Sequence, residues 1–242
     1  LGDLWLCSGQ SNMDWRLGDA NLAAEEIAHA QEPRMRLFMV PYVLADARED
    51  SFPVSETEGE TGRWSACTPH SAARFSAVGY HFGRALSPHV DRPIGLVLAA
   101  WGGTPAEAWT PWWALKTDAR LRPLVEGGGP PTPAWAEGAW DPSAIFHGMI
   151  APLTASAWKG VIWYQGESNA ARAEEYESLF PALIQSWRRE FQDPQLPFLF
   201  VQLAGFLEPV AKPAQSGSWA ELREAQRLTA LRTPSVGMVV AI

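Results

Sequence analysis

The chain has 242 residues, 47% of them apolar, which is enough for one large domain with a substantial core. Its formal net charge is −8 and its 19 basic residues form no stripe, which argues against a nucleic-acid partner. No apolar run reaches the roughly 18–20 residues of a membrane-spanning helix, so no membrane partner is expected.

Six strand-like runs recur at wide spacing along the chain. Most are continuous apolar runs rather than alternating ones, which is typical of parallel strands buried on both faces. The runs cover residues 3–8, 35–40, 94–100, 160–164, 198–203 and 236–242.

Helical periodicity lies between these runs. One helix is expected over 76–87, and a second is expected to end near Phe191, with Pro181 opening its main part. Leu222, Ala225, Leu228 and Leu231 mark a third. Alternating strands and helices predict an α/β fold, a mostly parallel, doubly wound sheet covered by helices on both faces. We expect residues 1–242 to form a single domain.

Other segments are expected at the surface or in the core. The acidic stretch 48–61 and the sequence EGGGPPTP at 126–133 are interpreted as surface insertions. Cys7 lies in an apolar run and is expected to be a buried thiol rather than half of a disulfide.

Six tryptophans are concentrated between residues 101 and 140, and two interpretations are open. They could form core packing with an aromatic lid, or a wall that stacks on sugar faces. The six are Trp101, Trp109, Trp112, Trp113, Trp135 and Trp140.

Polar, glycine-bearing turns follow three of the predicted strands. They are GQSNM at 9–13, WGGT at 101–104 and QGESN at 165–169. Since ligands bind at the carboxyl ends of strands in such sheets, the three turns are expected to meet at one edge. Each turn alone is ordinary, because a serine at a helix start is usually a cap and a glycine pair is usually a turn.

The chemistry of these turns fits acyl transfer. Ser11 can open a short helix with its hydroxyl exposed and its N–H free. Gly103 has no Cβ, so its N–H can approach a developing oxyanion closely. The side-chain amide of Gln165 could supply a further donor.

GQSNM, WGGTPAEAW and IWYQGESNA together resemble the sialic-acid 9-O-acetylesterase-like branch of the SGNH hydrolases, which is also similar to some acetyl xylan esterases. The segments FSAVGYHFGRAL, HGMIAPL and LPFLFVQLA extend the resemblance over nearly the whole chain. It implies a flavodoxin-like three-layer α/β/α sandwich.

The resemblance also implies site roles. Ser11 would be the nucleophile and an oxyanion donor, and Gly103 a second donor. Gln165 or Asn169 would be the third, and Glu167 would order the turn.

The sequence departs from the family in one respect. The general base of SGNH enzymes comes from a late D-x-x-H segment, and no aspartate here is followed three residues later by histidine. The chain ends in VGMVVAI, which resembles the strand before that segment, so we expect the base beyond residue 242. His70 and His147 lie in predicted loops and are the alternatives within the chain.

These features predict a serine esterase that removes O-acetyl groups from carbohydrates. No metal or organic cofactor is expected, since no His/Cys cluster has ligand spacing and no phosphate-binding loop is present. Two alternatives stay open at this point: an acetyl xylan esterase of the same fold, and a carbohydrate-binding domain that has lost its histidine. A nucleotide or flavin binder would share only the fold.

Overall fold

A seven-stranded sheet runs through the middle of the molecule. The structure is a computed structural model, and it describes residues 2–53, 61–127, 129, 133–136, 138–206 and 218–241. The strand order is β3-β2-β4-β1-β5-β6-β7. All neighbouring strands are parallel except β2 and β3. The strands are β1 (Asp3–Gly9), β2 (Glu32–Met39), β3 (Trp64–Cys67), β4 (Ile94–Ala100), β5 (Gly160–Tyr164), β6 (Phe198–Gln202) and β7 (Val236–Val240).

The six predicted strands are confirmed, and β3 is a seventh strand that was not predicted. β3 has four residues and pairs antiparallel at the edge of the sheet, where Trp64 is 46% exposed. It therefore lacks the continuous apolar run that marks the central strands. β4, in contrast, is buried along its whole length between β2 and β1.

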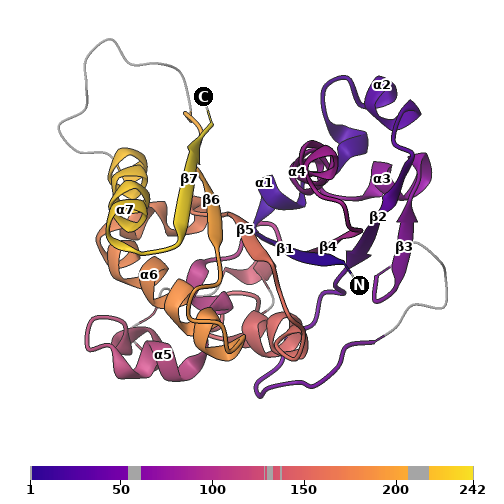
Figure 1. The fold of residues 1–242 in the computed structure, drawn as a ribbon. Helices are drawn as coiled ribbons and strands as arrows, with labels where there is room; N and C mark the ends of the chain where they lie inside the picture. The colour runs from indigo at the N-terminus through magenta and orange to yellow at the C-terminus, as the bar shows by residue number, and fades with distance from the viewer. Residues whose placement is uncertain are drawn as a thin grey trace, which may run out of the picture.

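Seven α-helices cover the two faces of the sheet in the described part of the chain. Figure 1 shows α1 to α4 on one side and α5 to α7 on the other, which gives the predicted α/β/α layering. Their bounds are α1 (Ser11–Asp14), α2 (Ala23–Ala28), α3 (Pro69–Arg74), α4 (Ala77–Leu86), α5 (Trp112–Thr117), α6 (Ala173–Glu190) and α7 (Ser218–Arg232). None of the described helices is long and apolar enough to cross a bilayer.

Pro181 lies inside α6 rather than at its start, which corrects the prediction. A proline within a helix removes one backbone donor and crowds the preceding turn, so it normally ends the helix. Here the 18-residue helix continues across it. The apolar face on both sides of Pro181, from Leu179 to Trp187, is buried in the core, and this burial outweighs the local cost.

The third predicted helix is confirmed as α7, but the apolar residues that marked it are not all buried. Leu222 and Ala225 are buried, whereas Leu231 is 68% exposed. Gln226 and Thr229 take the inner positions instead. Gln226 is buried because it makes specific hydrogen bonds there: its Oε1 accepts from the N–H of Leu203 (3.0 Å) and its Nε2 donates to the carbonyl of Gln165 (3.1 Å).

The core includes an aromatic cluster on the α6 side of the sheet. Trp163 of β5 lies edge-on to Trp187 (5.7 Å between ring centroids) and stacks on Phe180 (6.2 Å). Cys7 is a buried free thiol, as predicted, and burial raises its pKa. The two expected surface insertions fall partly outside the described residues, at 54–60 and at 128 and 130–132; the described residues 48–50 are exposed.

Candidate active site

The three polar turns meet at one edge of the sheet, as predicted. The N–H of Gln10, after β1, donates to the carbonyl of Tyr164 at the end of β5 (3.0 Å). The N–H of Trp101, after β4, donates to the carbonyl of Gly9 (3.0 Å). The side-chain oxygen of Gln10 accepts from the N–H groups of Gly166 (3.4 Å) and Ser168 (3.3 Å). The carboxyl ends of β1, β4 and β5 are thus joined directly.

Gly9 makes this close approach possible. Its φ is +140°, and a Cβ at this position would lie 2.1 Å from the carbonyl oxygen of Tyr164. A side chain here would therefore push β1 away from the end of β5. The glycine lets the chain leave β1 tightly against its neighbour and present the next residues at the sheet edge.

Ser11 is the first residue of α1 and is exposed. Within the described chain, no hydrogen bond engages its hydroxyl or its N–H, as expected for the first turn of a helix. Gly102 lies beside it, since a Cβ on Gly102 would be 3.5 Å from the Cβ of Ser11.

Gly103 adds a second backbone donor from the turn after β4. Its φ is +77°, and its carbonyl accepts from the indole N–H of Trp140 (2.7 Å). None of the described residues accepts from the N–H of Gly103. The arrangement combines an exposed hydroxyl with backbone N–H groups that have no acceptor in the described chain, two features that are compatible with acyl transfer.

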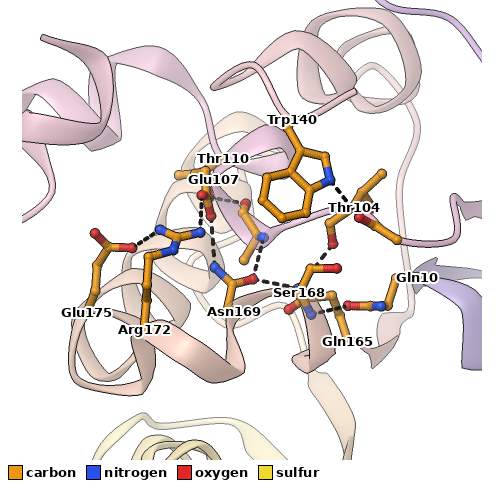
Figure 2. Close-up of polar contacts among 12 residues, drawn as sticks. Gln10, Thr104, Glu107, Thr110, Trp140, Gln165, Ser168, Asn169, Arg172 and Glu175 are labelled. Carbon is orange, nitrogen blue, oxygen red and sulfur yellow. Dashed lines mark hydrogen bonds and ion pairs between the residues drawn. The ribbon is translucent and has the colours of Figure 1, made fainter. Parts of the chain in front are cut away.

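Gln165 and Asn169 belong to a buried network behind this edge (Figure 2). The amide nitrogen of Gln165 donates to the carbonyl of Thr104 (3.2 Å) and to Oδ1 of Asn169 (2.7 Å). The amide nitrogen of Asn169 donates to Glu107 (2.9 Å), and its oxygen also accepts from the N–H of Ala106 (2.8 Å). Both protons of the Gln165 amide are therefore engaged within the protein, and a donor role toward an oxyanion stays a prediction for either residue.

Glu107 is the charged centre of this network, and it was not among the predicted site residues. Its side chain is 1% exposed and forms an ion pair with Arg172, which also pairs with Glu175. The sequence contains one indication of this role, because Glu107 is the single charged residue in WGGTPAEAW. A charge between buried apolar neighbours requires a partner, but the partner, Arg172, lies 65 residues away.

Glu167 contacts the helix that carries Ser11. Its Oε1 accepts from the side-chain amide of Asn12 (2.5 Å), the residue after Ser11. Its Oε2 is buried and has no hydrogen-bond partner among the described residues. Burial raises the pKa of Glu167, and the hydrogen bonds to its carboxylate oppose that shift only in part. This geometry is compatible with the predicted ordering role.

All five histidines lie in the described part of the chain, and none forms a hydrogen bond with Ser11. Nδ1 of His147 faces the carbonyl of Ala45 (3.3 Å), and His70 is an exposed residue of α3. Nδ1 of His29 faces the carbonyl of Glu25. His81 and His89 are exposed at α4 and just after it. In addition, no group of three or more His, Cys, Asp or Glu side chains among the described residues could hold a metal ion.

The tryptophans at positions 101 to 140 differ in their environments where the structure describes their side chains. Trp109 is fully buried, and Trp113 packs under Arg189 (4.4 Å from its guanidinium carbon to the ring centroid). Trp101 and Trp140 lie at the site, where Trp101 stacks on Tyr42 (4.5 Å between centroids). Trp112 is 43% exposed, and the side chain of Trp135 is outside the described part.

Comparison with known proteins gives a consistent result. The family described as carbohydrate esterase, sialic acid-specific acetylesterase matches residues 1–242. The chain is 35% identical to the sialate O-acetylesterase of Rattus norvegicus, over 86% of this chain and 44% of the relative. It is 34% identical to that of Homo sapiens, over 86% of this chain and 40% of the relative. The chain thus spans less than half the length of these relatives.

Solved structures show the same likeness. A carbohydrate acetylesterase from Xanthomonas citri superposes with a TM-score of 0.84 at 36% identity, over all of this chain and 50% of that one. A protein from Arabidopsis thaliana superposes with a TM-score of 0.55 at 21% identity, over 99% of this chain and 85% of that one, which shows a shared fold only.

Proposed function

The chain belongs to the sialic acid-specific acetylesterase family of carbohydrate esterases, and from that premise we propose that it hydrolyses O-acetyl esters of carbohydrates through an acyl-enzyme on Ser11. One observation carries the proposal. The exposed Ser11 lies at the carboxyl edge of the sheet beside the glycine pair that follows β4.

In the proposed mechanism, the hydroxyl oxygen of Ser11 attacks the acetyl carbonyl carbon while a base removes its proton. The N–H groups of Ser11 and Gly103 donate to the oxyanion that develops on the carbonyl oxygen. Collapse of this intermediate releases the sugar hydroxyl, which takes up the proton, and leaves acetyl-Ser11. Water then attacks the acetyl group, and acetate leaves as Ser11 regains its proton.

The proposal gives Gln165 and Asn169 a positioning role. Their amides hold the turn after β5 against Thr104 and Ala106, in the segment that follows Gly103. Glu167 holds α1 through Asn12 in a similar way. These contacts keep the two backbone donors in register with the hydroxyl, which is what a preorganised oxyanion site needs.

The general base is proposed to be a histidine outside these 242 residues. This part of the proposal is supported by the five histidines of the chain, none of which hydrogen-bonds Ser11. A serine hydroxyl without such a base stays protonated and is a weak nucleophile. Activity is therefore to be measured in the longest natural form of the protein.

The substrate class is proposed from the family and the relatives, with sialate esters first and acetylated xylan as the alternative. Acetate release from O-acetylated sialic acid, compared with release from acetylated xylo-oligosaccharides, separates the two. A carbohydrate-binding domain without catalysis is the remaining alternative, and it would have no use for the Ser11 hydroxyl.

The test is Ser11→Ala. It should remove nearly all turnover and leave the fold intact, with a residual rate on the order of 10³-fold over water from the rest of the site. A serine-reactive phosphonate should label the unchanged protein and not the variant. The control is Ser156→Ala, an exposed serine that precedes β5. Equal labelling or turnover after Ser11→Ala would contradict the proposed nucleophile.

A further inference from the structure

A cavity of about 120 Å³ opens beside the helix that carries Ser11. Asp14, at the end of α1, lines it on one side. Ala100, which directly precedes the turn with Gly102 and Gly103, lines it on another. Ser11 and Asp14 are three residues apart in α1, and residues at this spacing lie on the same face of a helix. The cavity therefore adjoins the proposed acyl site, although Ser11 does not line it.

Two arginines line this cavity, Arg16 after α1 and Arg74 at the end of α3. Neither guanidinium forms an ion pair or a hydrogen bond with any residue that the structure describes. The side chain of Arg74 is half-buried, so it loses hydration without a partner in return. Arg172, in contrast, is half-buried and pairs with Glu107 and Glu175.

Asp14 is the one acidic residue in the lining. Burial raises the pKa of Asp14, while a hydrogen bond from the hydroxyl of Tyr42 (2.7 Å) and the attraction of Arg16 oppose that rise. The two arginines outnumber this single carboxyl group, so the cavity keeps at least one net positive charge. That charge fits an anionic group on the ligand.

The rest of the lining suits a sugar. Met39, Leu98 and Ala100 give an apolar floor. Tyr42 is 56% exposed, and its ring stacks on Trp101 next to the glycine turn. Flat apolar sugar faces pack on surfaces of this kind, while guanidinium groups form paired hydrogen bonds with carboxylates.

We propose that Arg16 and Arg74 form a subsite for the carboxylate of an acidic sugar, whose ester group lies at Ser11. The subsite rests on the proposed esterase function and extends it to substrate choice. It selects acetylated sugars that carry a carboxylate over acetylated neutral sugars, because a neutral sugar leaves both guanidinium groups without an acceptor.

The experiment compares Arg16→Gln and Arg74→Gln with the unchanged protein on O-acetylated N-acetylneuraminic acid and on acetylated xylo-oligosaccharides. Each variant should lower kcat/KM for the acidic substrate by about 10- to 100-fold and that for the neutral substrate by less than about 2-fold. Arg74→Lys, which keeps the charge but not the fork, should lie between. The matched control is Arg92→Gln, which removes an exposed charge near Asp3 at the other end of the sheet and should change neither value.

Binding provides a readout that does not depend on turnover. N-acetylneuraminate should bind to the Ser11→Ala protein at least 10-fold more tightly than the neutral sugar N-acetylmannosamine, and the preference should disappear with Arg74→Gln. Equal binding of the two sugars by the unchanged protein overturns the subsite, even if hydrolysis of neutral esters still depends on Ser11. Carboxylate-dependent binding without any esterase turnover would overturn the proposed function and leave the subsite intact.

Discussion

Ser11 owes its exposure to the glycines around it. Gly9 allows the chain to leave β1 close to the end of β5, where a Cβ on residue 9 would lie 2.1 Å from the carbonyl oxygen of Tyr164. Gly102 keeps side-chain atoms away from the neighbourhood of the Ser11 Cβ. At the residue scale, the reactive group is thus placed by residues that have no side chain, which is why backbone conformation controls this site.

Gly103→Ala tests that control. Its φ of +77° is in the left-handed region, where an alanine costs about 1–2 kcal/mol. Relief of this strain would turn the N–H away, so we expect kcat to fall about 10²- to 10³-fold with a small change in KM.

The control for Gly103→Ala is Gly127→Ala. Gly127 has a φ of +86°, and a Cβ there would meet nothing within 4 Å, so this change carries the same backbone cost outside the site. Equal losses of activity in both variants would show that the effect comes from stability and not from the donor.

Glu167→Gln gives a pH-dependent prediction. Burial raises the pKa of Glu167 in the folded protein, so the folded state holds this proton more tightly than the unfolded chain does. The stability that this proton contributes is present below the ordinary glutamate pKa and is lost as pH rises through the raised value. The unchanged protein should therefore lose stability relative to Glu167→Gln across that window.

Urea unfolding of both proteins between about pH 4 and pH 8 measures this difference. Glu174→Gln, at an exposed position of α6, controls for the loss of a charge. If the unchanged protein instead gained stability relative to Glu167→Gln as the pH rises, the assigned direction of the pKa shift would be wrong.

At the scale of elements, the turn after β5 is held by contacts from several parts of the chain. Gln165 donates to Thr104 and Asn169, and its side-chain oxygen accepts from the hydroxyl of Tyr176 in α6 (3.0 Å). Its backbone carbonyl accepts from Gln226 of α7. Two helices and the segment after β4 therefore converge on one residue, which couples the stability of the layer to the geometry of the site.

Gln165→Ala should destabilise the protein by on the order of 3 kcal/mol, because it leaves buried partners without their hydrogen bonds. We also expect activity to fall, because the turn after β5 would become less ordered. Thermal unfolding and kcat are to be measured together, with Gln185→Ala on the exposed side of α6 as the control. A fall in kcat of about 10²- to 10³-fold at unchanged stability would instead assign the amide to the oxyanion.

At the scale of the whole molecule, the aromatic cluster connects the sheet to the α6 layer. The ring of Trp163 lies within 6.3 Å, between centroids, of the rings of Trp109, Phe180, Trp187 and Phe198. Trp163 and Phe198 come from β5 and β6, Phe180 and Trp187 come from α6, and Trp109 ends a 3-10 helix (Ala106–Trp109) after β4, so the cluster forms only when the layers assemble. The cluster therefore contributes to the free energy of unfolding of the whole domain and not to that of any single element.

Trp163→Ala should cost about 3–5 kcal/mol, since it opens a large cavity among fully buried rings. The measurement is urea unfolding, in which the midpoint should fall while the slope stays constant. Trp112→Ala removes the same side chain at a position that is 43% exposed, and its cost should be below about 1 kcal/mol. Similar costs for the two changes would contradict the assigned core.

Local patterns determined the central strands, the glycine-bearing turns and the meeting of those turns at one edge. Each apolar run and each turn is a pattern of residues close in sequence, and the rule that parallel strands end at one edge of the sheet placed the turns together. The motifs that contain Ser11, Gly103 and Gln165 also identified the family.

Tertiary structure alone decided the rest. The short edge strand β3 depends on pairing with β2, and the helix across Pro181 depends on burial of its apolar face. The burial of the polar residue Gln226 in α7 depends on its hydrogen bonds with the distant Gln165 and Leu203. Such partners lie 23 to 61 residues apart, and a single sequence carries no local pattern for contacts at that separation.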